Sequence, residues 1–130
     1  MSIVGHGIDL VEVARIRAMV DEHGQRFLDR CFTPGEQAYN FESRRRFEHL
    51  AARFAAKEAT LKALGTGLTG GIAWTDIEVI STPNGAPRLA LRSAAATAAS
   101  VVGANSWLIS LSHTDTHAVA SVIAIGRALS

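Results

Sequence analysis

The stretch 47–67 most constrains what this chain can fold into, because it predicts one long helix closed by glycine. Its interior consists of good helix formers, and Gly65 stands where a helix C-cap is expected. At about 100° per residue the larger apolar side chains fall on one stripe, which should face a core or a subunit interface. These residues are Phe47, Leu50, Ala51, Phe54 and Leu61.

Charged residues interrupt this helix in a regular way. Glu58 falls within the apolar stripe, although carboxylates are rarely buried without a partner or a metal. Lys62 lies one turn beyond it, and Arg46, Arg53 and Lys57 line a neighbouring ridge. Glu58 and Lys62 could form an ordinary helix pair worth about 0.2–0.5 kcal/mol beside a solvated basic face. They could equally belong to a site, and the helix alone does not decide between the two.

The composition limits the class of protein. With 130 residues, 48% of them hydrophobic, the chain is expected to form a single domain over residues 1–130. A net charge of +1 argues against nucleic acid as a partner. No apolar run approaches the roughly 20 residues of a membrane span, and the first residues do not resemble a signal peptide, so a cytoplasmic protein without membrane contact is expected. Cys31, the only cysteine, excludes an internal disulfide.

The first ten residues or so predict a strand with an unusual face. Over 3–13, Gly5, Gly7 and Asp9 fall on the same side. Glycine weakens a strand, so two at alternate positions indicate that another backbone or a ligand approaches closely there. Asp9 could join such a site, or it could be a capping residue ahead of the next helix.

The remaining elements predict an α+β fold with a mainly antiparallel sheet, packed on the long helix and several short helices. A helix is expected over about 12–22, and Thr33 to Glu36 has the pattern of a capping box with proline in the first turn. Two hairpins are expected, one turning at Asn84-Gly85 and one at residues 113–117. The expected strands are 76–81, 87–91, 107–112 and 118–125, with an alanine-rich helix over 93–102.

Asp9 and Glu58 form a candidate metal-binding pair. Oxygen-only ligands with open positions suit Mg²⁺, which is often completed by substrate phosphates. Lys62, Arg53 and Lys57 would then neutralise phosphate charge. His113, at a strand end, is open to two interpretations, a turn residue or a catalytic group. The residues by themselves therefore predict a Mg²⁺-dependent enzyme that acts on a phosphate ester.

Six segments, spread over nearly the whole chain, resemble one known family. They are GIDLVEVARI (7–16), FTPGE (32–36), RFAAKEATLKALGTG (53–67), DIEV (76–79), NGAPR (84–88) and SLSHTDTHAVA (110–120). Together they resemble the holo-[acyl-carrier-protein] synthases, the small trimeric group of 4′-phosphopantetheinyl transferases. The pairing of the segment around Asp9 with the segment around Glu58 makes the resemblance specific.

The resemblance implies an activity and the residues that carry it. The expected reaction transfers 4′-phosphopantetheine from coenzyme A to a serine of apo acyl carrier protein, releases adenosine 3′,5′-bisphosphate and supports fatty acid biosynthesis. Asp9 and Glu58 match the family's Mg²⁺ ligands. Lys62 matches a lysine near the phosphates. The expected catalytic residues are therefore Asp9, Glu58 and Lys62.

The resemblance also implies how coenzyme A is held. Arg53, Lys57 and His113 match positions associated with the coenzyme A phosphates. The turn that borders the adenine is matched by Asn84, Gly85 and Pro87. In this family the active sites lie between the subunits of a homotrimer, which would explain an acid on an otherwise apolar stripe.

A basic first helix docks the acidic carrier protein in this family, and Arg15 and Arg17 match that role. This chain departs from the pattern at Asp21, Glu22 and His23, where further basic residues are expected. Two rival hypotheses stay open. One is a non-catalytic trimer that binds carrier proteins, and the other is a different Mg²⁺-dependent phosphotransferase.

Overall fold

Residues 1–127 are described by the computed structural model, and the segment 128–130 lies outside the described residues. In chain order the elements are β1 (Ser2–Glu12), α1 (Val13–His23), α2 (Gln25–Cys31), α3 (Pro34–Ala38), α4 (Arg46–Leu64), the short 3-10 helix η1 (Trp74–Asp76), β2 (Ile77–Ser81), β3 (Pro87–Leu91), α5 (Ser93–Val101), β4 (Ala104–His113) and β5 (His117–Gly126). The predicted α+β fold is confirmed. Both predicted hairpins are present, and their strands differ from the expected bounds by a few residues.

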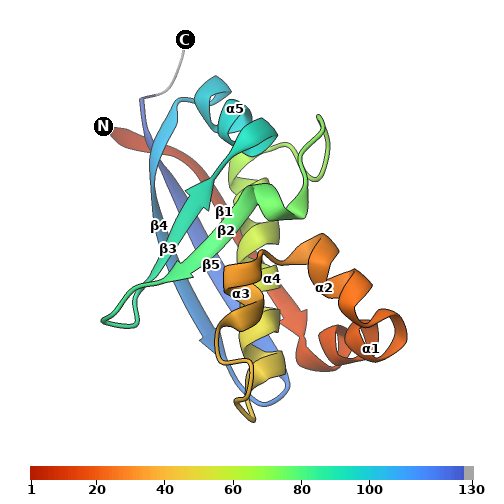
Figure 1. Cartoon of the computed structure of the whole chain (residues 1–130). Coiled ribbons are helices and arrows are strands. Elements are labelled where there is room, and N and C mark those ends of the chain that lie inside the picture. Colours follow the sequence, from red (N-terminus) through yellow and green to blue (C-terminus); the bar gives the residue numbers. More distant parts are fainter. Residues whose placement is uncertain (128–130) are drawn as a thin grey trace.

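Helix α4 is the centre of the fold (Figure 1). It packs on one face of an antiparallel three-stranded sheet in the order β1-β5-β4, while a second antiparallel sheet is formed by β2 and β3. Helices α1 and α2 lie together beside α4, on the right in Figure 1. Gly65 ends α4 in the left-handed conformation, with φ of 75°, as the sequence predicted.

Glycine allows β1 to pass directly against α4. A Cβ added at Gly7 would overlap the carbonyl oxygen of Ala59, and one added at Gly5 would overlap that of Ala63. The expectation that another backbone approaches this face of the strand is therefore confirmed. The close contact places Asp9, two residues further along the same face, next to the last two turns of α4.

The prediction of a single apolar stripe on α4 was too narrow. Fourteen of its 19 residues are buried, because two sheets and the short helices α1 and α3 surround it. Arg53 and Lys57, expected on a cationic ridge, are among these buried residues. Glu58 is only half-buried, so the elements packed on α4 leave this position partly exposed.

The opposite face of the three-stranded sheet is not covered by any described residue. Large apolar side chains on β1 and β4 point outward there, and four of them are more than half exposed. They are Ile3, Ile8, Leu10 and Leu108. The register places Ser121 and Ile123 of β5 between them. An apolar sheet face of this kind is typical of a surface that meets another protein.

Residues 1–127 contain no helix that is both long and apolar enough to cross a membrane.

Candidate active site

Asp9 and Lys62 meet in an ion pair between β1 and α4. The Lys62 ammonium lies 3.0 Å from Oδ1 of Asp9 and donates a second hydrogen bond of 2.9 Å to the carbonyl oxygen of Ile8. The Lys62 side chain is 54% exposed and that of Asp9 is 13% exposed, so the pair is open to a ligand mainly on the lysine side. Two simpler interpretations of the sequence are wrong, namely Glu58 and Lys62 as a helix pair and Asp9 as a capping residue. Lys62 pairs with Asp9 rather than with Glu58 on its own helix, and Glu12 occupies the N-cap of α1.

Glu58 shares this region with Asp9. Burial raises the pKa of Glu58, and the nearby Asp9 carboxylate raises it further, while Arg15 and Lys62 oppose the shift. Two carboxylates that repel each other are stabilised by a shared cation. Within the described part of the chain, no cluster of three or more His, Cys, Asp or Glu side chains could hold a metal. Asp9 and Glu58 offer only carboxylate oxygens, a donor set that fits a hard cation such as Mg²⁺ with its other ligands from water or phosphate.

A second cluster surrounds Arg53. Its side chain lies over the Tyr39 ring, 4.0 Å from the ring centre, and donates to Oγ of Ser81 at 2.8 Å and to the carbonyl oxygen of His49 at 3.3 Å. Arg53 is 5% exposed, and its Nε has no hydrogen-bond partner among the described residues. An unpaired buried donor on a cation indicates that an acceptor, such as a phosphate oxygen, belongs there.

Two histidines extend this second cluster. The rings of His49 and His113 pack edge to face with centres 5.5 Å apart, and Asn40 hydrogen-bonds Nδ1 of His49 at 3.0 Å. Burial lowers the pKa of His49, and the charges of Arg53 and His113 act in the same direction. Nδ1 of His113 is buried without a partner in the part of the chain described. His113 is thus held by packing at the end of β4 rather than within a turn.

Lys57 does not lie where the sequence placed it. The expectation that it contacts a coenzyme A phosphate is contradicted by its 0% exposure and by its contacts. Its ammonium pairs with Glu36 at 2.8 Å and donates to the carbonyl oxygens of Trp74 and Ile77. An ammonium has three donors, and all three are used. Burial lowers the pKa of Lys57, and the Glu36 carboxylate opposes this shift.

The two clusters lie on different sides of α4. Arg53 and Glu58 are five residues apart, which corresponds to roughly 140° around the helix axis. The predicted adenine-binding turn follows Ser81 at the tip of the β2–β3 hairpin, on the side of Arg53. Oδ1 of Asn84 accepts a hydrogen bond from the Ala86 amide at 3.1 Å and thereby fixes this turn. One chain therefore carries two separated half-sites.

The predicted carrier-docking arginines differ in position. Arg15 lies over Phe54, 5.6 Å from the ring centre, and lines a cavity of about 170 Å³ between α1, α2 and α4. An adjoining cavity of about 270 Å³ shares Met19, Phe27 and Arg30 with it and adds Arg26. Arg17 instead stacks on Phe47 at 4.4 Å, at the beginning of α4. The two cavities together form an apolar groove with basic edges, and this groove lies beside Arg15 rather than Arg17.

Sequence reasoning missed three residues of the second cluster, namely Tyr39, His49 and Ser81. His49 had a usable signal, because it lies four residues before Arg53 and so on the same helix face. Tyr39 and Ser81 had none, because they reach Arg53 from separate elements.

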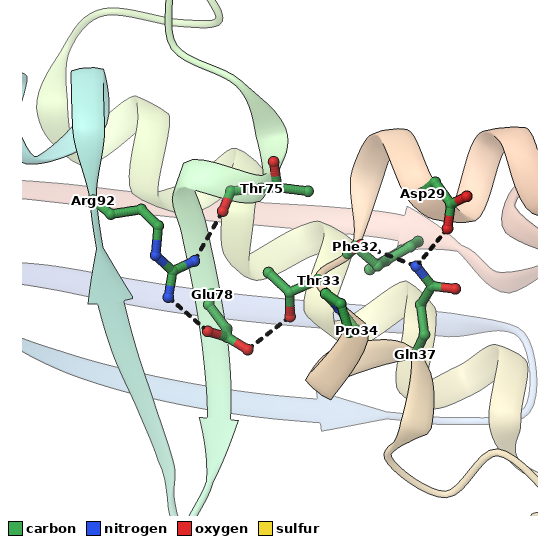
Figure 2. A pocket seen from close by; sticks show the side chains of 8 residues that line it. All are labelled: Asp29, Phe32, Thr33, Pro34, Gln37, Thr75, Glu78 and Arg92. Atoms are coloured by element: carbon green, nitrogen blue, oxygen red, sulfur yellow. Dashed lines mark hydrogen bonds and ion pairs between the residues drawn. The ribbon is translucent and has the colours of Figure 1, made fainter.

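A further cavity of about 550 Å³ lies between α2, α3 and β2 (Figure 2). Its central polar groups are already paired with each other. Thr33 donates to Glu78 at 2.7 Å, and Arg92 bonds both Glu78 at 2.8 Å and the carbonyl oxygen of Thr75 at 3.0 Å. The hydrogen bonds to Glu78 keep its pKa below the usual value. These hydrogen bonds connect α3 to the β2–β3 sheet, and the cavity is not the candidate active site.

The sequence and the fold both match known proteins. A sequence model of the 4′-phosphopantetheinyl transferase superfamily matches residues 5–120, which defines the class of enzyme. The chain is 47% identical to a holo-[acyl-carrier-protein] synthase of Koribacter versatilis, over 93% of this chain and 97% of the relative. It is 50% identical to that of Trichlorobacter lovleyi, over 93% and 96% of the two chains.

Solved structures give the same result. The fold matches holo-[acyl-carrier-protein] synthase of Neisseria meningitidis with a TM-score of 0.85 at 31% identity, covering 95% of this chain and 99% of the other. It also matches the Helicobacter pylori enzyme in complex with coenzyme A, with a TM-score of 0.81 at 30% identity, covering 92% and 99%. The chain therefore belongs to the holo-[acyl-carrier-protein] synthases, enzymes of the 4′-phosphopantetheinyl transferase superfamily.

Proposed function

We propose that this enzyme transfers 4′-phosphopantetheine from coenzyme A to a serine of apo acyl carrier protein, depends on Mg²⁺ and releases adenosine 3′,5′-bisphosphate. The observation that carries the proposal is the grouping of Asp9, Glu58 and Lys62 between β1 and α4. The coenzyme A complex of the Helicobacter pylori relative supports the donor.

The chemistry follows from the charges in the first half-site. Asp9 and Glu58 would hold Mg²⁺, which when bound supplies positive charge for the pyrophosphate oxygens. Lys62 neutralises charge that develops on the leaving phosphate and donates hydrogen bonds to it. The serine oxygen attacks the phosphorus, the bond from that phosphorus to the bridging oxygen of the departing bisphosphate breaks, and the serine proton passes to a base, for which the Glu58 carboxylate is one candidate.

The second half-site would bind the nucleotide end of coenzyme A. Arg53 and His113 each present a buried nitrogen without a partner among residues 1–127, which supports a phosphate position between them. The turn of Asn84, Gly85 and Pro87 would border the adenine. Lys57 is not part of this proposal, because its three donors are occupied.

We further infer a homotrimer in which each active site lies between two subunits. The two half-sites face different sides of α4, which supports an arrangement in which one coenzyme A molecule contacts two subunits. The uncovered apolar face of the three-stranded sheet supports association through that face. In a closed ring, the metal half of one subunit would meet the nucleotide half of the next.

The acidic carrier protein would dock on the groove beside Arg15. Its apolar floor and the basic edge formed by Arg15, Arg26 and Arg30 suit an amphipathic acidic helix. Arg17 contributes less to this surface, because its guanidinium is stacked on Phe47.

Arg26→Glu is expected to raise the KM for the carrier protein by roughly tenfold or more and to leave the KM for coenzyme A unchanged, because opposite charge steers the two proteins together and Arg26, unlike Arg15, is not among the charges that act on Glu58. Steady-state rates with each substrate varied in turn would measure both constants. Arg127→Glu, the same change of charge at an exposed residue after β5, is the matched control. Equal effects of the two substitutions would show that only the total charge matters.

The proposed function is tested by the intact mass of an apo carrier protein after incubation with this enzyme, coenzyme A and Mg²⁺. The expected result is the gain of one phosphopantetheine group, which EDTA prevents. Tight coenzyme A binding without any gain of mass on several carriers would favour the non-catalytic binding protein instead. Transfer to small alcohols or water in place of a carrier would favour another phosphotransferase. The cytoplasmic location and the role in fatty acid biosynthesis stay predictions.

A further inference from the structure

Glu36 and Lys57 form a buried ion pair that the proposed chemistry does not use. Their charged atoms lie 2.8 Å apart, and the two residues are 1% and 0% exposed. Glu36 belongs to the capping box of α3, where its Oε1 accepts the Thr33 amide at 2.9 Å. Capping α3 requires only one of its two oxygens, and it does not require a buried lysine.

Two of the remaining hydrogen bonds of this pair go to one edge of β2, and a third goes to the carbonyl oxygen of Trp74 in η1. Oε2 of Glu36 accepts the Val79 amide at 2.8 Å, and Lys57 donates to the carbonyl oxygen of Ile77. On its other edge β2 pairs with β3. The ion pair thus takes the place that a neighbouring strand would occupy along this edge.

Arg53 adds a third contact to β2, this one from α4. It lies one turn before Lys57 on α4 and donates to Oγ of Ser81. The attachment points Ile77, Val79 and Ser81 follow each other at every second residue, toward the turn of the β2–β3 hairpin. Figure 2 shows a further link from α3, in which Thr33 bonds the Glu78 side chain.

We infer that Glu36 and Lys57 are positioning residues for coenzyme A. They hold β2 against α3 and α4, and so place Ser81 next to Arg53 and the Asn84–Pro87 turn next to the nucleotide half-site. The inference rests on the proposed function, because the half-site that these contacts position is the one proposed to bind coenzyme A. The contacts themselves do not touch the substrate.

The chemistry of the pair favours this role over a purely stabilising one. A buried ion pair contributes little more to stability than apolar side chains of the same volume, because both charges lose their hydration. It does supply directional bonds, here to two backbone groups of one strand. Small displacements of a binding group by about 1 Å change reaction rates by up to about 100-fold, so such directional contacts have a large effect on a substrate site.

The experiment compares Lys57→Met, Glu36→Gln and the double variant that carries both changes. Each single variant leaves one uncompensated polar partner in the core, whereas the double variant removes both charges and is expected to recover most of the thermal stability. Thr60→Ala is the matched control, since Thr60 is equally buried on α4 but bonds only within its own helix, to Ala56.

Two readouts separate this inference from the proposed function. Hydrogen exchange of the β2–β3 hairpin, measured on the protein without coenzyme A, reports the attachment itself. It should become faster by about tenfold or more in the double variant and remain unchanged in Thr60→Ala. The KM for coenzyme A should rise by about tenfold in the double variant, with the KM for the carrier protein unchanged.

A double variant that is stable, exchanges its hairpin amides at the wild-type rate and keeps the wild-type KM would overturn the inference. So would a Thr60→Ala variant with an equal rise in this KM, since general loosening would then explain both. Failure of the wild-type enzyme to modify any carrier would count against the proposed function alone, because the exchange measurement does not depend on transfer.

Discussion

Asp9→Asn is expected to lower the rate of phosphopantetheine transfer by about 1,000-fold or more at saturating coenzyme A and Mg²⁺. Asparagine has the shape of aspartate and still accepts the hydrogen bond of Lys62, so the contact between β1 and α4 is retained. The substitution removes the negative charge that a divalent cation requires at this position. Initial rates from the mass of the carrier protein, over a Mg²⁺ titration, would measure the effect.

Asp29→Asn is the control for this substitution. It removes the same charge from an exposed carboxylate on α2, which bonds Gln25 and Gln37. Full activity of this control and an unchanged melting temperature of Asp9→Asn would assign the loss to the site. More than about a tenth of the wild-type rate in Asp9→Asn would show that Asp9 is not a metal ligand.

Mixed trimers of two inactive variants are expected to recover activity. Asp9→Asn damages the metal half-site, and Arg53→Met damages the nucleotide half-site on the other side of α4. If each active site combines halves from two subunits, random mixing of equal amounts gives about a quarter of all sites both intact halves, and a trimer that contains both variants has about one such site in three. Co-expression of the two variants, purification of the mixed assembly through two different tags and the same transfer assay would measure this recovery.

A mixture of Asp9→Asn with Glu58→Gln is the matched control, because both changes lie in the same half-site and no arrangement of subunits restores it. Arg53→Met keeps most of the volume of the buried side chain and so limits the loss of packing. Recovery in neither mixture would place the whole active site within one chain, and recovery in both would mean that the two half-sites were wrongly divided.

Much of the fold could be predicted from local patterns. The capping box of Thr33 and Glu36, the glycine at the end of α4 and the Asn84-Gly85 turn each depend on a few neighbouring residues, and each is present. The glycines of β1 predicted a close backbone contact, which α4 provides. Such features are decided by φ, by short-range hydrogen bonds and by the absence of a Cβ.

Long-range contacts decided what could not be predicted. The helical ridge containing Arg53 and Lys57 is correct as geometry, but whether it is solvated depends on what packs over it. The covering elements are β2 and α3, far away in the sequence, and their approach converts Lys57 from a candidate phosphate ligand into a buried partner of Glu36. The FTPGE segment gave the cap but no sign that its glutamate also bonds β2.

The contacts along β2 also bear on how the chain avoids self-association during folding. An unpaired strand edge offers its amides and carbonyls to any other extended chain, and aggregation often begins there. On β2 the Val79 amide and the Ile77 carbonyl are already engaged by Glu36 and Lys57. A foreign strand would have to displace a buried salt bridge before it could add to this sheet. The same two side chains therefore make this edge a poor template for misfolded assemblies.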